Sequence, residues 1–210
     1  MFGAILHGFM LALGLILPLG VQNVFVFNQG ALHARFRRAI PAILTASLCD
    51  TLLISLAILG VSVVVFEYEW VRILLFSLGI GFLVYMGVVT WKNRAHAAEH
   101  KQDAARSLTA KKQVTFALSV SLLNPHAVLD TVGVIGTSSL TYAGPVKAAF
   151  AVTCIGVSWL WFLGLGLAGR AAGRLDSSGR FLSGIHAVSA VIMWGTAIYL
   201  AYSLLRIWLV

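Results

Sequence analysis

Six long apolar segments follow one another along this chain of 210 residues and dominate what it can fold into. They cover residues 3–27, 39–66, 73–91, 114–140, 148–169 and 181–205. A helix needs about 20 apolar residues to cross a lipid bilayer, and each segment is close to that length or longer. Because backbone inside lipid must satisfy its own hydrogen bonds, each segment is predicted to be a membrane-spanning helix.

The composition favours an integral membrane protein. Hydrophobic residues make up 60% of the chain and charged residues only 10%, whereas a soluble domain carries about 25% charged residues. A cytoplasmic enzyme, a nucleic-acid reader and a disordered protein are therefore disfavoured. The first 23 residues lack the basic start and small-residue cleavage site of a secretory signal, so we interpret them as part of the first membrane helix.

The basic residues predict the orientation in the membrane. Twelve of the fifteen Lys and Arg residues fall in the loops 33–38, 92–112 and 170–180. If every segment spans, these loops share one side, and the positive-inside rule makes that side cytoplasmic. Both chain ends would then face outside. If the first segment only dips into the membrane, the N-terminus lies inside. The net charge of +8 is explained by these loops without nucleic acid.

The chain divides into two halves of three segments, residues 1–91 and 113–210, on either side of the basic loop 92–112. Pro18 and Pro125 interrupt the first segment of each half. An odd number of spans inverts one half relative to the other, and inverted repeats with broken helices are typical of secondary transporters. We predict one all-α integral membrane domain over 1–210, with six transmembrane helices in two inverted repeats and broken first and fourth helices. The alternative is a simple proline kink.

Asp50 is the only charged residue of the second segment, and Ser47, Thr51 and Ser55 share its helical face. A carboxylate at the bilayer centre costs about 2.5–3.5 kcal/mol, and such residues usually face a cavity or a partner. We predict that Asp50 belongs to a functional site. The alternative is a packing group bonded to a neighbouring helix.

Asp130 is the only charged residue of the fourth segment. Asn124 before Pro125 favours a helix start inside the membrane, whose free N–H groups suit a substrate carboxylate. His126 lies four residues before Asp130, on the same helical face. His126 is a candidate proton carrier, and the alternative is a helix-start residue bonded to a backbone carbonyl.

The first segment contains a second candidate helix break at Pro18 and Gly20, followed by the amides of Gln22 and Asn23. A proline removes a backbone donor and frees carbonyl oxygens one turn earlier. Those oxygens and the two amides are predicted to bind the ammonium group of a substrate, and a simple kink is the alternative.

Metal, cofactor and enzyme chemistry are not predicted. His96, Glu99 and His100 have the side chains of metal ligands, but they form a single His pair without further ligands nearby. Cys49 and Cys154 lie inside apolar segments and are interpreted as small hydrophobic residues without a disulfide. The sequence contains no nucleophile with a neighbouring base.

Two motifs resemble those of the lysine exporter (LysE) family of bacterial amino-acid exporters. They are LPLGVQNVFVFNQGAL at residues 17–32 and LNPHAVLDTVGVIG at residues 123–136. Val21 stands where the family usually has a proline. The carboxylate of the second motif falls on Asp130, and the acidic residue of the family's second span falls on Asp50. The Leu-Asp-Thr part is similar to the lysine and arginine branch rather than the threonine and homoserine branch.

The resemblance implies a multi-pass exporter of lysine or arginine in the bacterial inner membrane. No ATP-binding P-loop is present in the sequence, so exchange with protons is the expected energy source. The residues expected to bind substrate or couple protons are Asp50, Asp130, Gln22, Asn23, Asn124 and His126. The alternatives are export of a neutral amino acid or a metal cation and, more remotely, a membrane-embedded enzyme. The expected partners are substrate, protons and lipid, and a homo-oligomer stays open.

Overall fold

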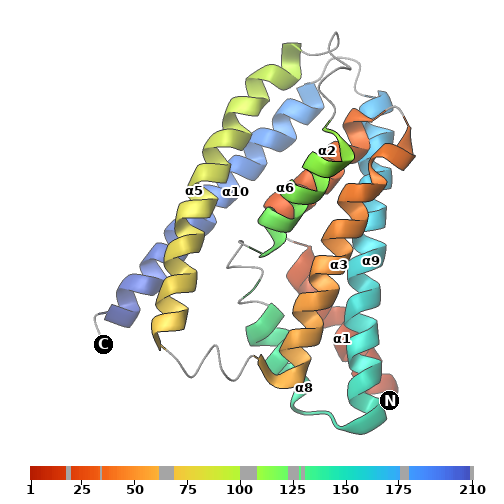
Figure 1. Ribbon diagram of the computed structural model, residues 1–210, viewed down its shortest axis with the longest axis vertical. Coiled ribbons are helices and arrows are strands. Elements are labelled where there is room, and N and C mark those ends of the chain that lie inside the picture. Colours follow the sequence, from red (N-terminus) through yellow and green to blue (C-terminus); the bar gives the residue numbers. More distant parts are fainter. Residues whose placement is uncertain are drawn as a thin grey trace.

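A computed structural model describes residues 1–17, 20–33, 35–61, 69–99, 108–122, 128, 131–175 and 180–208, and every element in these ranges is helical (Figure 1). The first half contains α1 (Phe2–Ile16), α2 (Val21–Leu32), the 3-10 turn η1 (Phe36–Arg38), α3 (Ile40–Leu56), the π-helical turn η2 (Ala57–Val61) and α5 (Glu69–Glu99). The second half contains α6 (Ala110–Leu122), the π-helical turn η4 (Thr131–Gly136), α8 (Thr137–Ser139), α9 (Gly144–Leu175) and α10 (Arg180–Trp208).

The first apolar segment forms two helices rather than one. α1 ends at Ile16, α2 begins at Val21, and their axes meet at 80°. Gly20 has an extended backbone and precedes the first residue of α2, so the chain changes direction there. Pro18 lies outside the described residues, as does Pro125 in the other half.

The helices of the two halves pack across each other. α1 and α2 pack on α9, whereas α6 and η4 pack on α3. The long helices α5 and α10 pair along their length, with Trp91 against Trp194 at a ring distance of 5.7 Å. Thus α1 and α2 of the first half contact α9 of the second half, and α6 and η4 of the second half contact α3 of the first half (Figure 1).

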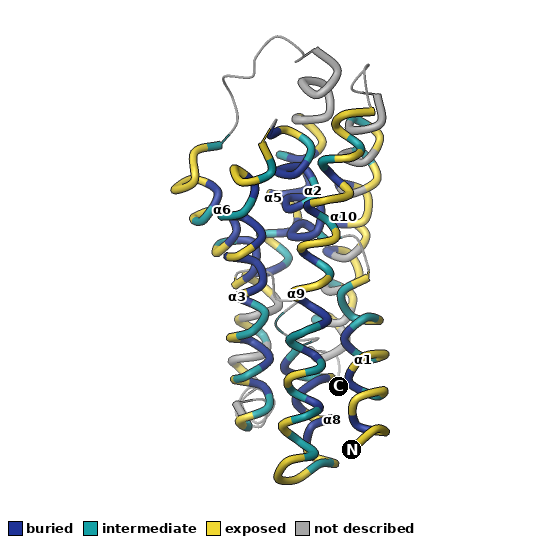
Figure 2. The backbone as a smooth tube through the Cα atoms, turned by 90° about the vertical axis from the view of Figure 1, so that its right-hand side faces the viewer, coloured by how far each residue is buried: buried dark blue, intermediate teal, exposed yellow. Residues whose placement is uncertain are grey.

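Glycines bring the backbones of α2 and α9 into direct contact. A Cβ atom on Gly169 would overlap the carbonyl oxygen of Phe27, and one on Gly173 would overlap the carbonyl oxygen of Ala31. A Cβ atom on Gly30 would overlap the carbonyl oxygen of Gly166. α2 is the most enclosed of the described helices, with nine of its 12 residues buried (Figure 2).

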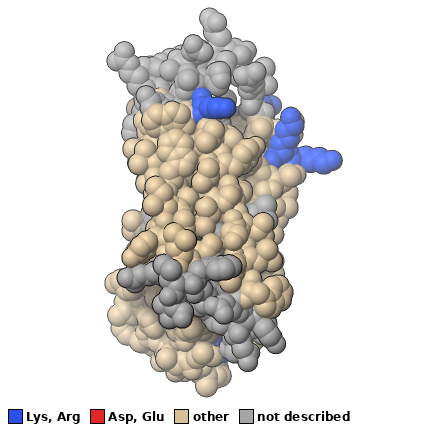
Figure 3. Space-filling view, turned by 90° about the vertical axis from the view of Figure 1, so that its left-hand side faces the viewer, with Lys and Arg blue, Asp and Glu red and all other residues tan. Residues whose placement is uncertain are grey.

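The outer surface fits a lipid environment. Among the described residues, Ile40–Gly60 and Gly144–Leu175 are each long and apolar enough to cross a membrane, and the bent pair α1–α2 makes a third if it is one span. Large apolar side chains such as Leu48, Val152 and Leu160 are exposed. Where its residues are described, the face in Figure 3 is uncharged across its middle and carries Lys or Arg near its upper end.

Most of the described basic residues, among them Arg35, Arg37, Arg38, Lys111, Lys112, Arg170 and Arg174, lie at one end of the bundle, whereas Lys147 lies in the first turn of α9 at the other end. η1, the first turn of α6 and the last turns of α9 lie together at the first of these ends, and we call it the arginine end. The start of α1 and the end of α10 lie at the opposite end, which we call the terminal end (Figure 1). The helix α5 continues to Glu99, so the expected loop 92–112 is partly an extension of the third helix.

The contact between α2 and α9 predicts that position 169 does not accept a side chain larger than that of glycine. Gly169→Ala is expected to destabilise the protein by about 1–3 kcal/mol, because the added methyl group meets backbone that cannot move aside. Gly164→Ala on the same helix is the control, since nothing lies within 4 Å of its Cβ position. Thermal unfolding in detergent measures both variants, and equal melting temperatures would contradict the packing.

Candidate functional site

Asp50 lies on α3 and receives a hydrogen bond on each carboxylate oxygen. Gln22 Nε2 donates to Oδ1 at 3.2 Å, and Ser158 Oγ donates to Oδ2 at 2.8 Å. Gln22 comes from the first turn of α2 and Ser158 from the middle of α9, so three helices meet at the carboxylate. Both donors are neutral, and the side chain keeps partial exposure. An ionised Asp50 would thus carry a negative charge that these two partners solvate but do not neutralise.

Asn23 closes the break between α1 and α2. Its Nδ2 donates to the carbonyl oxygen of Ile16, the last residue of α1, at 2.7 Å. A helix end leaves its last carbonyls without partners, and this amide satisfies one of them. Trp161 Nε1 on α9 donates to Asn23 Oδ1 at 3.2 Å. The amide expected to bind substrate is thus engaged with the protein's own backbone and with α9.

A second polar group extends the site along α3. Thr51 Oγ1 donates to the carbonyl oxygen of Ser47 at 2.7 Å, and Trp159 Nε1 donates to Thr51 Oγ1 at 3.0 Å. The Ser47 hydroxyl is fully buried and has no hydrogen-bond partner among the described residues. Buried polar atoms are usually paired, so this hydroxyl is an available contact one turn from Asp50.

The site candidates of the second half lie outside the described residues. These are Asn124, Pro125, His126 and Asp130. Thr131, which follows Asp130 in the chain, begins η4, and η4 packs against α3 and η2. Of the predicted residues, the structure therefore brings Gln22 and Asn23 to the region of Asp50.

Metal binding finds no support in the described part of the chain, where no group of three or more His, Cys, Asp or Glu side chains could hold an ion. Cys49 and Cys154 are both buried free thiols. The described residues of this region instead provide the carboxylate of Asp50, the amides of Gln22 and Asn23, and the hydroxyl groups of Ser47, Thr51 and Ser158.

Two site residues on α9, Ser158 and Trp161, were not anticipated from the sequence. The fifth segment contains no charged residue, so it has no side chain whose burial in a membrane would be costly enough to indicate a functional site. The available signal was spacing: Cys154, Ser158 and Trp161 recur at intervals of four and three residues, on one helical face. That face contacts α1, α3 and α2 in turn.

Comparison with known proteins gives consistent matches over nearly the whole chain. Residues 13–204 match the family described as LysE type translocator. The chain is 52% identical over 201 residues to the "Putative amino-acid transporter YisU" of Bacillus subtilis, covering 96% of this chain and 90% of that protein. It is 35% identical over 200 residues to the "Arginine exporter protein ArgO" of Salmonella typhimurium, covering 93% and 92%. No solved structure matches.

Asn23 is predicted to stabilise the break between α1 and α2 through its two hydrogen bonds. Asn23→Leu keeps a similar size but leaves the Ile16 carbonyl and the Trp161 indole N–H unpaired, so a loss of about 1–3 kcal/mol is expected. Gln29→Leu is the matched control on α2, because the buried Oε1 of Gln29 has no partner among the described residues. Melting temperatures in detergent compare the two, and an equal loss in both variants would contradict this role.

Proposed function

Since the chain belongs to the family of LysE type translocators, we propose that it is a secondary transporter that exports basic amino acids, lysine or arginine, from the cytoplasm. The observation that carries this proposal is the Asp50 carboxylate, held between α2 and α9 by two neutral donors. A cationic side chain supplies the positive charge that these donors lack. Relatives named as amino-acid transporters and arginine exporters support the substrate class.

The break between α1 and α2 supports recognition of the other end of an amino acid. α2 begins at Val21, beside Gln22, so the first backbone N–H groups of this helix lie close to Asp50. Free N–H groups at a helix start favour a carboxylate. A zwitterion with a cationic side chain would then meet positive dipole ends and a carboxylate within one site. In the second half, Asn124, Pro125 and His126 are proposed to provide the corresponding helix start.

Exchange with protons is the proposed source of energy. Moving one positive charge out against an inside-negative potential costs about 2.3 kcal/mol per 100 mV. A carboxylate away from water takes up a proton readily, and a bound cation favours its ionised form. Substrate and proton would compete for Asp50 and for Asp130, which links export of one to uptake of the other.

The packing of the helices supports two inverted repeats. α1 and α2 lie on α9, α6 and η4 lie on α3, and α5 lies on α10. An arrangement in which each half reproduces the other predicts this reciprocal pairing. The six spans of the proposal are α1 with α2, α3 with η2, α5, the interrupted segment from α6 to α8, α9, and α10.

Asp50→Asn and Asp130→Asn are expected to insert normally and to lose lysine and arginine export. Asn keeps the size of Asp but carries no charge, so binding of a cation weakens by about 10- to 100-fold. Everted membrane vesicles with radiolabelled lysine, arginine and leucine measure transport and substrate class together. Glu99→Gln, at the end of α5, is the control for loss of a carboxylate outside the site.

The outcomes separate the alternatives. Wild-type export in both Asp variants would reduce the two carboxylates to packing groups. Transport of leucine but not of arginine by the wild-type protein would favour the second candidate, a neutral amino-acid exporter.

We propose that the protein lies in a bacterial inner membrane and that its arginine end faces the cytoplasm. A reporter inserted in the loop 92–112 is expected to behave as cytoplasmic, and one fused after Val210 as external, because Lys and Arg are retained on the inner side. Alkaline phosphatase and fluorescent protein fusions measure this. A cytoplasmic C-terminus would contradict the six-span topology.

A further inference from the structure

A buried amide on α6 joins this helix to the connection between α2 and α3 at the arginine end. Gln113 on α6 is 1% exposed, and its Nε2 lies 2.9 Å from each of His33 Nε2, the Arg38 carbonyl oxygen and the Leu108 carbonyl oxygen. Burial, and to a smaller extent the charge of Arg38, lowers the pKa of His33. We call this contact the Gln113 tie. It fastens α6 to the chain between α2 and α3.

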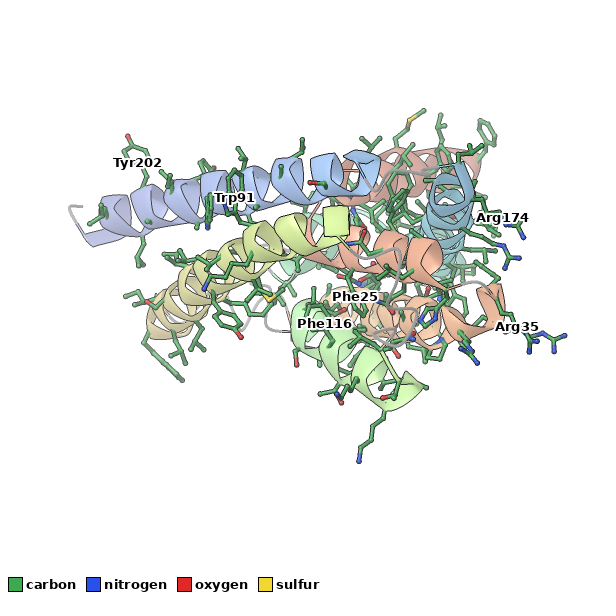
Figure 4. The ribbon with its side chains drawn as sticks, turned by 90° about the horizontal axis from the view of Figure 1, so that it is seen from above. Phe25, Arg35, Trp91, Phe116, Arg174 and Tyr202 are labelled. Carbon is green, nitrogen blue, oxygen red and sulfur yellow. The ribbon has the colours of Figure 1, made fainter. Side chains whose placement is uncertain are left out.

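A pocket of about 400 Å³ opens beside the Gln113 tie and is lined by both its members, together with Arg37, Arg38, Pro41 and Thr109. Beyond the tie the path toward Asp50 is filled by apolar side chains. Phe25 on α2 and Phe116 on α6 pack against each other with ring centres 4.5 Å apart and ring planes tilted by 37° (Figure 4). They belong to a core in which Ala42, Ala46 and Phe162 are also buried.

A second contact of the same kind lies toward the terminal end. His7 Nδ1 on α1 lies 2.8 Å from the hydroxyl oxygen of Tyr142, two residues before α9. Phe150 packs against both rings at 5.6 and 5.4 Å. We call this contact the Tyr142 tie. It fastens α1 to the start of α9.

The two ties lie on opposite sides of Asp50. His33 is eleven residues after Gln22 on α2, which corresponds to about 16 Å along a helix. Phe150 is eight residues before Ser158 on α9, which corresponds to about 12 Å in the other direction. The Tyr142 tie holds α1, which ends at Ile16 before the break to α2, and the Gln113 tie holds α6, which ends at Leu122. A helix end leaves its last carbonyls outside the intrahelical ladder, so such a helix can tilt as a unit.

We propose that the Gln113 tie and the Tyr142 tie are the two gates of the transporter, which open alternately to give the Asp50 site access to one membrane face at a time. The inference rests on the proposed transport function. With both ties formed, the structure is the state closed at both ends. Release of the Gln113 tie frees α6 from α3, and release of the Tyr142 tie frees α1 from α9.

The two native cysteines report on these movements. Cys49 on α3 is 4% exposed, and α3 packs against α6. Cys154 on α9 is completely buried, and its Sγ lies 3.6 Å from the carbonyl oxygen of Gly8, next to His7 on α1. Cys154 is therefore covered by the helix that the Tyr142 tie holds in place, and Cys49 lies on the helix against which α6 packs.

The test is labelling with a membrane-impermeant maleimide, applied to either face of sealed vesicles. Single-cysteine proteins are made with Cys154→Ser or Cys49→Ser. Gln113→Leu is expected to raise labelling of Cys49 about two- to tenfold from the arginine-end face only, as the loss of a hydrogen bond shifts the gate toward its open form. Tyr142→Phe is expected to raise labelling of Cys154 to the same degree from the opposite face only.

Matched controls are the neighbouring surface variants Thr115→Val on α6 and Thr141→Val beside Tyr142, which are expected to leave both thiols protected. If Gln113→Leu or Tyr142→Phe exposes both thiols from both faces, or neither thiol, the gates are wrong. The labelling uses no substrate, so its expected result does not depend on which amino acid is exported. If the labelling contradicts the gates, the proposal that the protein exports lysine or arginine still stands and is tested separately by transport.

Discussion

The Asp50 carboxylate is the interaction on which the arrangement of the helices depends. In an apolar helix its oxygens require donors, and Gln22 and Ser158 supply one each. These donors belong to α2 and α9, whose backbones touch through glycines such as Gly169. The glycine contact fixes the distance between the two donors, so helix packing and the geometry of the carboxylate are a single constraint. A bulkier contact would separate the donors and leave one oxygen unsolvated.

The break in the first apolar segment explains the different roles of the adjacent amides of Asn23 and Gln22. An uninterrupted helix would satisfy the carbonyl of Ile16 internally. Once α1 ends there, the carbonyl needs another donor, and Asn23 provides it from the first turn of α2. The neighbouring residue, Gln22, is then directed to Asp50. The carbonyl freed by the break is therefore satisfied by Asn23, and Gln22 stays available to Asp50.

The sequence predicted the all-helical class from its long apolar segments, and it predicted a helix break at Pro18 and Gly20, which agrees with the gap between α1 and α2. A functional role for Asp50 stays a prediction. The family predicted from the motifs at residues 17–32 and 123–136 is confirmed. Ser158 and Trp161 were missed, since periodicity shows which residues share a face but not which of several apolar helices that face contacts. Substrate binding by Asn23 stays a prediction. Its hydrogen bond to the carbonyl of Ile16 could not be predicted, because the sequence does not show which donor reaches a carbonyl freed at a helix end.

The two halves of the chain carry their carboxylates at different distances from Pro18 and Pro125. Asn23 and Asp130 each stand five residues after a proline, whereas Asp50 and Ser158 stand 32 and 33 residues after it. In the proposed inverted repeats, each of these pairs, the second of them offset by one residue, holds one carboxylate and one neutral polar group. Under that proposal the two carboxylates are not at equivalent positions, because Asp50 belongs to the second apolar segment and Asp130 to the fourth. Two symmetric carboxylates would face identical surroundings and compete for the same partner. Placed at unlike positions, they can have different affinities, which a division between substrate cation and coupled proton requires.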